Sequence, residues 1–456
     1  MLEALVDRMM ERQNQLAIAL ASETTDYRGL LDRVGAWRAR LAARHLGEGR
    51  VVSIEGDFSV EGVAAFLALI LEKHTGVPLS PDAAAHHDAF REIGGVEYRV
   101  VIGADSRVVP TDRIADHPCY TVLRGRCHPG LVLFSSGSTG RPKAALHDLN
   151  PLLKKFLPVR PPFCTLAFLQ LDHIGGVNTL LYSLANGGGL VVPANRSPGA
   201  VCQVMARYRV ELLPTSPTFL NLLLLSGEYR RHDLSALRLI TYGTEPMPAS
   251  TLQRVRCTFP QVELRQTYGM TELGILRAKS RGADSLWVKV GGEGYETKIV
   301  DGRLWIRSDS AMLGYLNAPS PFDADGFFDT GDLVETDGEW LHIKGRQSDL
   351  INVGGSKVYP AEVESTLLEM ENVADVSVHG EPHPLTGQIV VAQVRLREEE
   401  PLASFKMRLR RFCDGRLERY KVPVKIVFTD APLYSERCKR VRPRSSPVSQ
   451  PSEAAV

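Results

Sequence analysis

Residues 133–147 read LFSSGSTGRPKAALH, a segment in which small, turn-forming residues follow an apolar run and end at Pro142 and Lys143. The apolar residues predict a buried strand, and the alternation of Ser, Gly and Thr predicts a loop. Such a loop offers many backbone N–H groups and hydroxyls that can surround a polyphosphate, and one lysine supplies a positive charge. The alternative is an ordinary surface turn after a strand.

The spacing separates this loop from the two commonest phosphate-binding motifs. From Gly137 the pattern is G-x-x-G-x-P-K, which is neither the Walker pattern G-x-x-x-x-G-K-S/T nor the dinucleotide pattern G-x-G-x-x-G. Pro142 also disfavours helical backbone at Arg141, so a helix cannot begin there. We therefore expect the loop to hold phosphate in a different way.

Length and composition restrict the class of protein. The chain of 456 residues is long enough for two or three domains. Its 54 basic and 53 acidic residues give a net charge of +1, so no overall field recruits nucleic acid or a membrane surface. The longest apolar run, residues 63–71, is too short to cross a bilayer. The seven cysteines form no C-x-x-C pair, which predicts free thiols in a cytoplasmic protein.

The pattern of the chain changes twice. Up to about residue 286, alternating helical and strand patterns predict parallel sheets covered by helices. Residues 287–345 contain short alternating strands, with Asp-Gly turn signals at 301 and 337 that predict hairpins. A small α+β region follows, and the Pro/Ser-rich residues 444–456 are expected to be disordered. The predicted fold class is α/β.

Polar residues follow several predicted strands. Residues 266–272 read QTYGMTE, residues 327–332 read FFDTGD, and residues 345–355 read GRQSDLINVGG. Open α/β sheets bind ligands at the ends of their strands. Each segment alone also has an ordinary explanation: Tyr268 as a core residue, Asp332 as a turn residue, Arg346 as a solvated charge and the glycine pair as a bulge.

In this order, these segments resemble the adenylate-forming superfamily of acyl- and aryl-CoA synthetases, carrier-protein adenylation domains and luciferases. The resemblance covers about residues 25–443. The segment SSGSTGRPKAALH resembles the family's phosphate loop, YGTEP and QTYGMTE its adenine pocket, RLWIRS and FFDTGD its ribose region, and GRQSDLINVGG its hinge. The resemblance implies an N-terminal AMP-binding domain over residues 1–348 and a mobile C-terminal domain over 349–443.

The resemblance also implies a two-step reaction with ATP and Mg²⁺. A carboxylate attacks the α-phosphorus of ATP and releases pyrophosphate, and the thiol of CoA then displaces AMP. The protein would act mainly by positioning and by neutralising charge. Alternative acceptors are a carrier protein, an amine or another small nucleophile, and a non-carboxylate oxyanion could replace the acid. Lys143, Glu272 and Asp332 argue against a non-catalytic nucleotide-binding relative.

Residue roles follow from the matched motifs. The β- and γ-phosphates would be held by Ser135, Ser136, Gly137, Ser138, Thr139, Gly140 and Lys143. Tyr268 would lie on the adenine ring, and the opposite wall would be formed by Gly243, Thr244 and Glu245. Asp332 would accept both ribose hydroxyls, with Arg346 beside them. Thr271 would contact the α-phosphate and Glu272 the Mg²⁺.

The C-terminal motifs supply the remaining roles. Lys439 matches the lysine that bridges the carboxylate and the α-phosphate, although Cys438 stands where the family usually has glycine. Asp349 matches the hinge between the two domains. Gly354 and Gly355 would line a narrow passage for the pantetheine arm of CoA or of a carrier protein.

The acid itself is less well specified by the sequence. His173 lies where many CoA-forming relatives carry a histidine or an aromatic residue near the carboxylate, and a core histidine is the alternative. We expect Gly175, Gly176 and Gly243 to leave room behind it, which favours an aromatic or medium-chain acid over acetate.

Overall fold

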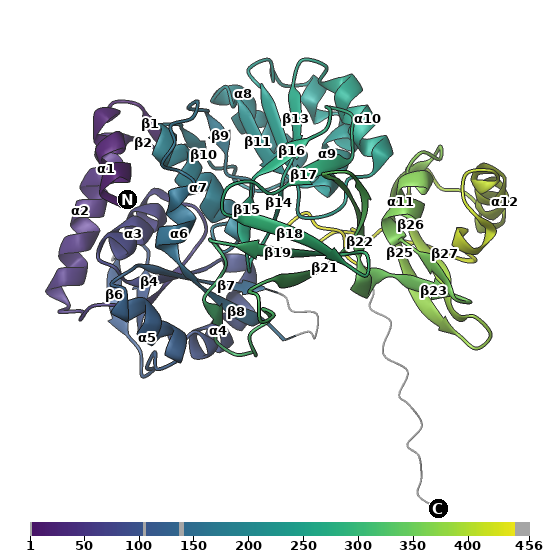
Figure 1. Ribbon diagram of the computed structural model, residues 1–456. Coiled ribbons are helices and arrows are strands. Elements are labelled where there is room, and N and C mark those ends of the chain that lie inside the picture. Colours follow the sequence, from purple (N-terminus) through teal and green to yellow (C-terminus); the bar gives the residue numbers. More distant parts are fainter. Residues whose placement is uncertain (1, 104–105, 136–140, 443–456) are drawn as a thin grey trace, which may run out of the picture.

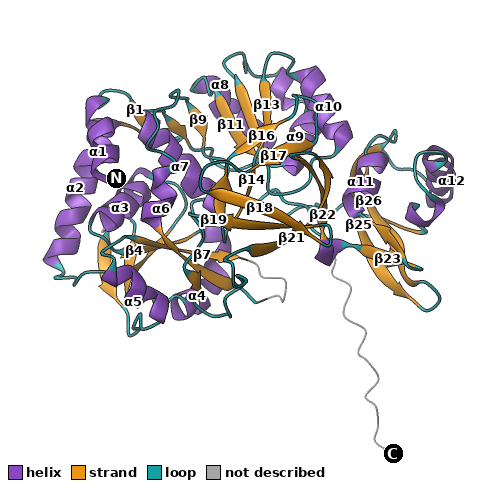
Figure 2. Ribbon diagram, in the orientation of Figure 1, coloured by secondary structure: helices purple, strands orange, loops and turns teal. Residues whose placement is uncertain are grey.

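The computed structural model describes residues 2–103, 106–135 and 141–442 (Figure 1). The expected phosphate-loop residues Ser136, Gly137, Ser138, Thr139 and Gly140 lie outside this part of the chain, as does the segment 444–456. Within it, a large N-terminal region of helix-covered sheets is joined to a smaller C-terminal α+β domain, which confirms the predicted fold class (Figure 2).

One large sheet has seven strands, all parallel to their neighbours except β2. Its order is β13 (Glu263–Gln266), β12 (Leu239–Tyr242), β11 (Leu212–Thr215), β9 (Thr165–Leu166), β10 (Leu190–Val191), β1 (Leu16–Ala19) and β2 (Thr24–Asp26). The helices in the same part of the chain are α7 (Ile174–Asn186), α8 (Pro198–Arg207), α9 (Pro217–Ser226) and α10 (Ala249–Thr258).

The second seven-stranded sheet is mixed. Its order is β20 (Gly314–Tyr315), β8 (Lys143–Asp148), β7 (Gly130–Ser135), β4 (Thr75–Leu79), β3 (Val51–Glu55), β5 (Tyr98–Val101) and β6 (Arg107–Pro110). The accompanying helices are α1 (Leu2–Glu11), α2 (Tyr27–Ala43), α3 (Val60–Leu71), α4 (His87–Ile93), α5 (Pro118–Gly125) and α6 (Leu149–Lys154).

The expectation of parallel sheets is therefore wrong at the edges. Strands β7 and β8 are antiparallel, as are β8 and β20, β5 and β6, and β1 and β2. Parallel neighbours would need a crossover of about a dozen residues or more, whereas only seven residues separate Ser135 from Lys143. The phosphate-loop motif thus connects two antiparallel strands.

Helix α3 forms part of the buried core of the N-terminal region. Its sequence, VEGVAAFLALIL, is apolar on almost every face, and it is buried against α2, β3 and β4. The Ser59 side chain caps it by accepting a hydrogen bond from the Gly62 N–H at 2.9 Å. Among the described residues, no helix is long and apolar enough to cross a membrane.

A third sheet has six strands, all antiparallel to their neighbours. Its order is β16 (Ala278–Ser280), β17 (Trp287–Val290), β22 (Trp340–Arg346), β21 (Phe328–Asp337), β19 (Arg303–Ser308) and β18 (Tyr295–Val300). It begins earlier than the hairpin region expected from residue 287. The turn signal at Asp301 is confirmed, because Asp301 and Gly302 adopt φ values of 51° and 74° between β18 and β19. A separate hairpin pairs β14 (Tyr268–Met270) with β15 (Gly274–Leu276).

The C-terminal domain has five strands and two α-helices. The strands are β24 (Ser356–Val358), β23 (Ile351–Val353), β26 (Gly387–Leu396), β25 (Val373–His383) and β27 (Lys425–Phe428), and the helices are α11 (Pro360–Leu367) and α12 (Leu402–Cys413). After β27 the chain, yellow in Figure 1, returns to the large region. All seven cysteines are free thiols in the described chain.

Candidate active site

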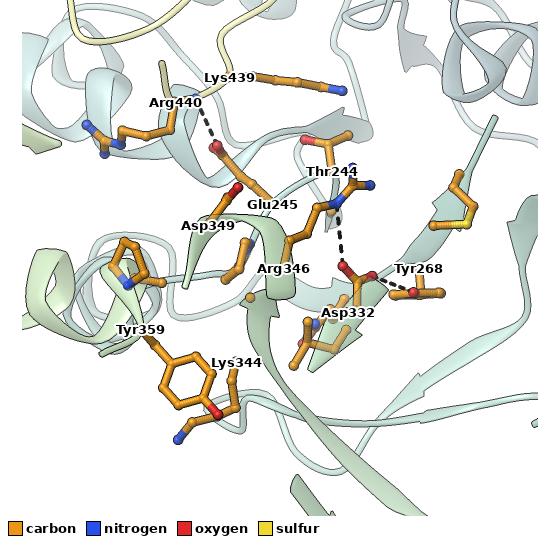
Figure 3. Close-up of a pocket in the computed structure, with 18 of the residues that line it drawn as sticks. Thr244, Glu245, Tyr268, Asp332, Lys344, Arg346, Asp349, Tyr359, Lys439 and Arg440 are labelled. Carbon is orange, nitrogen blue, oxygen red and sulfur yellow. Dashed lines mark hydrogen bonds and ion pairs between the residues drawn. The ribbon is translucent and has the colours of Figure 1, made fainter. Parts of the chain in front are cut away.

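A cavity of about 280 Å³ lies between the N-terminal region and the C-terminal domain (Figure 3). It is lined by Gly243, Thr244, Glu245, Pro246, Gln266, Thr267, Tyr268, Gly269, Met270, Asp332, Ile343, Lys344, Gly345, Arg346, Asp349, Tyr359, Pro360, Ala361, Lys439, Arg440 and Arg442. The set includes Lys439 and every residue expected to contact the adenine and the ribose, although these are far apart in sequence.

The register of the first large sheet creates one side of the cavity. Tyr242 in β12 lies opposite Gln266 in β13, so the segments that follow leave the sheet at the same edge. Gly243 is required there, because a Cβ atom would lie 2.6 Å from Thr267 Oγ1. The Gln266 Oε1 atom is buried and has no hydrogen-bond partner in the described chain. This side therefore offers a polar atom to a bound molecule.

Asp332 is the central carboxylate of the cavity and is only 8 % exposed. Its Oδ2 accepts a hydrogen bond from the Tyr268 hydroxyl at 2.5 Å, and its Oδ1 lies 3.5 Å from Arg346 Nε (Figure 3). Burial raises the pKa of Asp332, and the nearby Arg346 opposes that effect. Burial, together with the Asp332 charge, also raises the pKa of the Tyr268 phenol. The group presents a carboxylate acceptor beside an aromatic face.

The two ends of the phosphate-loop motif lie opposite each other, and Tyr315 links one of them to Glu272. Ser135 at the end of β7 lies opposite Lys143 at the start of β8. The Lys143 Nζ atom lies 5.0 Å from the centre of the Tyr315 ring, and the Tyr315 hydroxyl donates to Glu272 Oε1 at 2.7 Å. Tyr315 thus connects the lysine and the carboxylate, and the sequence reasoning missed it.

Asn317 fixes the same end of the loop and was also missed. Its Oδ1 accepts from the Ala144 N–H at 3.0 Å, and its Nδ2 donates to the Pro142 carbonyl at 2.9 Å. Both residues lie in the segment GYLNAP, whose β20 strand pairs with β8. Only that pairing, which the sequence does not reveal, shows their relation to the loop.

The surroundings of Glu272 are compatible with a metal-ion site in which the protein supplies few ligands. The described chain contains no group of three or more His, Cys, Asp and Glu side chains that could hold a metal ion. Mg²⁺ commonly uses one or two carboxylates together with substrate phosphates, so a single carboxylate is sufficient. Thr271 precedes Glu272, and its carbonyl accepts a hydrogen bond from His147 Nε2 at 2.6 Å.

The side chain of Lys439 lies close to that of His173. The two side-chain nitrogens, Lys439 Nζ and His173 Nε2, are 3.4 Å apart. His173 Nδ1 accepts from the Gly175 N–H at 3.0 Å and caps α7, while burial and nearby cations lower the pKa of His173. The neutral ring therefore carries its proton on Nε2. The Lys439 ammonium and the His173 Nε2–H are thus two neighbouring donors, and one carboxylate oxygen could accept a hydrogen bond from each.

The glycines near His173 do not leave the expected room. A Cβ atom on Gly175 would lie 2.4 Å from Leu169 Cδ1, and one on Gly176 only 1.8 Å from the Gln170 carbonyl oxygen. Gly243 is equally crowded by Thr267. These residues allow close packing of the backbone, so the argument for a larger acid from these glycines is wrong.

The segment around Lys439 is attached to the large region on both sides. Cys438 adopts a φ of 49°, in the left-handed region that glycine adopts most easily, so it keeps the backbone shape expected of a glycine there. Its carbonyl accepts from the Ser216 hydroxyl at 2.6 Å, and the Arg440 N–H donates to Glu245 Oε2 at 2.9 Å. Glu245 thus holds the C-terminal segment as well as lining the cavity.

The expected hinge residue, Asp349, lines the cavity, whereas the two glycines expected to line the pantetheine passage do not. Asp349 lines the cavity, ends the short 3₁₀ helix Gln347–Asp349, and lies 3.4 Å from Arg442 Nη1. Gly354 and Gly355 form the exposed turn between β23 and β24, with φ values of 58° and 89°, and are not among the residues that line the cavity. In this arrangement the structure does not bring the two glycines to the site.

The environment of Lys439 leads to a pH prediction. Burial, together with Arg437 and Arg346, lowers the pKa of Lys439 to about 8, while Glu245 opposes the shift. The ammonium form is therefore present below pH 8 and is lost above it. We expect kcat/KM for pyrophosphate release to fall as the pH rises through about 8, because this ratio reports groups of the free enzyme.

The matched control is Lys439→Arg, since a guanidinium stays protonated over this range. Its residual activity should show no such fall. A parent profile that remains flat to about pH 10, near the ordinary pKa of lysine, would contradict the assignment.

Comparisons with known proteins agree with this geometry. The family model described as AMP-binding enzyme matches residues 100–316, and the model for the AMP-binding enzyme C-terminal domain matches residues 362–436, so the two cover more than half of the chain. An indoleacetate–CoA ligase from Aromatoleum aromaticum is 29% identical over 394 residues, which are 77% of this chain and 74% of that protein.

Two further similarities extend over nearly the whole length. A 2-succinylbenzoate–CoA ligase from Geobacillus kaustophilus is 27% identical and is matched over 91% of both chains. The crystal structure of the anthranilate CoA ligase AuaEII, in complex with anthranoyl-AMP, has the same fold, with a TM-score of 0.79, 22% identity and coverage of 96% of this chain and 95% of that one. The chain is therefore an AMP-binding enzyme of the adenylate-forming superfamily.

Proposed function

We propose that this protein uses ATP to convert an aromatic or medium-chain carboxylic acid into an acyl-adenylate, with release of pyrophosphate, and then transfers the acyl group to the thiol of CoA. The observation that carries the proposal is the convergence of Lys439 Nζ and His173 Nε2, 3.4 Å apart, at the edge of a cavity with a buried aromatic and carboxylate pair. Two N–H donors this close together can bind a carboxylate, and an aromatic ring beside a buried carboxylate can bind the base and the ribose of a nucleoside.

Each group in the cavity has a proposed task in adenylation. The Tyr268 ring would lie on adenine, and Asp332 would accept the ribose hydroxyls while Arg346 balances its charge. The Lys439 ammonium would contact the acid and the α-phosphate, so that negative charge gathering on phosphorus is stabilised without rearrangement of the site. Thr271 would donate to the α-phosphate.

The phosphate side relies on Lys143 and Glu272. Lys143, with Ser135 and the loop residues 136–140, would neutralise the β- and γ-phosphates. Glu272, oriented by the Tyr315 hydroxyl at 2.7 Å, would hold Mg²⁺, which supplies further charge neutralisation at the phosphates when bound.

Two of the sequence relatives are named for indoleacetate and 2-succinylbenzoate, acids that contain a benzene ring, and another, from Mycobacterium tuberculosis and 28% identical, is named for long-chain fatty acids. These names support an aromatic acid and an aliphatic one alike. A carrier protein, an amine or another small nucleophile remains the alternative acceptor, because the site for adenylation would be the same.

The test measures pyrophosphate release from Mg·ATP with a panel of aromatic and aliphatic acids, with and without CoA, and identifies the products by mass. The proposal requires an aromatic or medium-chain acid that releases pyrophosphate and becomes a thioester only when CoA is present. An acid that forms only a bound adenylate would assign the second step to another acceptor. Absence of pyrophosphate release with every acid would refute the proposal.

We also propose that Asp349 is the hinge between a domain of residues 1–348 and a mobile domain of residues 349–443. A rotation there would carry Lys439 out of the cavity and bring Gly354 and Gly355 towards the pantetheine arm. Asp349→Pro should slow acyl transfer by about 10- to 100-fold and change adenylation by less than about threefold, because proline restricts the backbone change at a hinge.

Separate single-turnover assays of the two half-reactions measure this difference. Asp349→Ala is the control, since it removes the ion pair with Arg442 but leaves the backbone free to rotate. If proline slows both half-reactions equally, Asp349 is not the hinge.

A further inference from the structure

Arg437 and Asp172 form an ion pair between two segments that are distant in sequence. Arg437 Nη2 donates to Asp172 Oδ2 at 2.8 Å. Asp172 is only 8 % exposed, whereas about a third of the Arg437 side chain is exposed. The carboxylate is therefore largely removed from water, and Arg437 is its partner.

The pair lies next to the contact between Lys439 and His173. Asp172 directly precedes His173 and α7, and Arg437 is two residues before Lys439. Two short segments are thus joined at two neighbouring points, first by the ion pair and then by the nitrogens 3.4 Å apart. A shift of Arg437 would be transmitted directly to Lys439.

The other charged residues of this segment have different partners. The Arg440 side chain pairs with Asp375, and Arg442 pairs with Glu364 at 2.6 Å, and both carboxylates belong to the C-terminal domain. These pairs connect the segment to the domain that carries it. The Arg437 side chain instead crosses to the large region.

We propose that Asp172 and Arg437 are a positioning pair that holds Lys439 in the site during adenylation and separates for acyl transfer. This inference rests on the proposed two-step function. Because the pair joins the two domains, it exists only when they are arranged as in this structure. Asp172 also neutralises a cation near Lys439, which favours the ammonium form.

The first test compares Asp172→Asn, Arg437→Gln and the double variant in single-turnover assays, with the most active acid of the panel. Each single change should slow adenylation by about 10- to 100-fold, and the double variant should be no slower than the slower single variant, because coupled partners are not additive. The KM for ATP should change by less than about twofold, since the pair does not line the nucleotide cavity. CoA transfer from preformed adenylate should keep the parent rate.

The control is Arg411→Gln, a change of an exposed arginine in α12, which should leave both half-reactions unchanged. Additive losses in the double variant would overturn the inference. Equal slowing of the two half-reactions would also overturn it, because that is the behaviour of a general structural contact.

A second test does not depend on activity. Cys438 is only 4 % exposed and follows Arg437 directly, so release of the segment should expose its thiol. Labelling with N-ethylmaleimide, followed by peptide mass spectrometry, should be at least about fivefold faster at Cys438 in each single variant, because the local opening becomes more frequent. Labelling at the buried Cys202 should not change, which reports that the fold is intact.

The two tests distinguish a failure of the positioning role from a failure of the proposed function. Unchanged labelling of Cys438 in folded variants would overturn the positioning role even if the parent enzyme adenylates normally. Faster labelling of Cys438 in variants of a protein that adenylates no acid would support docking by the pair and refute the proposed function instead.

Discussion

Replacing Lys439 with alanine is expected to slow adenylate formation by about 100- to 1000-fold, the range typical of a lost group that stabilises charge in the transition state. Lys439 is the cation that approaches His173 within 3.4 Å at the edge of the cavity. In the proposed reaction, its loss would remove the lysine cation that balances the negative charge developing on the α-phosphate. Single-turnover pyrophosphate release measures the effect.

Acyl transfer provides the internal control for this variant. If the C-terminal domain moves between the steps, CoA should react with preformed adenylate at the parent rate in Lys439→Ala. An alanine variant that adenylates normally would move the role to a neighbouring cation. Arg437 and Arg440 are the obvious candidates, but each is already paired with an aspartate, Asp172 and Asp375 respectively.

Asp332→Ala is expected to raise the KM for ATP by about 30- to 300-fold, because the buried carboxylate would accept both ribose hydroxyls, and its loss would leave them unpaired in the cavity. The structure holds its two oxygens with Tyr268 and Arg346. Loss of the carboxylate would also leave the Arg346 charge without its partner. At saturating ATP, kcat should fall much less, since the ribose 2′- and 3′-hydroxyls are several bonds away from the reacting α-phosphorus.

Two matched variants sharpen this prediction. Tyr268→Phe removes the hydrogen bond to Asp332 but keeps the ring that would lie on adenine, so the KM should rise by only about 3- to 10-fold. Asp332→Asn keeps the shape but replaces an acceptor with a donor, so its effect should approach that of alanine. Steady-state kinetics and calorimetric binding of ATP measure both, and an unchanged ATP dependence in Asp332→Ala would rule out the assigned role.

Much of the site could be predicted from the sequence, because its residues lie immediately after strands with clear patterns. Strands β12 and β13 end at residues 242 and 266, where the sequence suggests, and their register places Gly243 beside Thr267, the residue before Tyr268. The position of Lys439 was predicted despite the unusual Cys438. Cys438 adopts the left-handed backbone that the motif needs.

The remaining features depend on contacts between distant segments, which local patterns do not specify. Tyr315 joins Lys143 to Glu272 only because the two-residue strand β20 pairs with β8. The Asp172–Arg437 pair connects parts of the chain 265 residues apart. The roles of Gly175 and Gly176 were misjudged for the same reason, since only the structure shows what a side chain there would meet.

The cavity has walls from two domains, and this has a consequence for inhibition. Any molecule that binds more tightly when both walls are present must, by thermodynamic reciprocity, stabilise this arrangement of the domains. In the proposed two-step cycle, a compound that fills the space between Tyr268 and Tyr359 would therefore hold the enzyme in the adenylation arrangement. If the acceptor is CoA, such a compound would prevent thioester formation without occupying the site of the thiol, and added CoA would not compete directly with it.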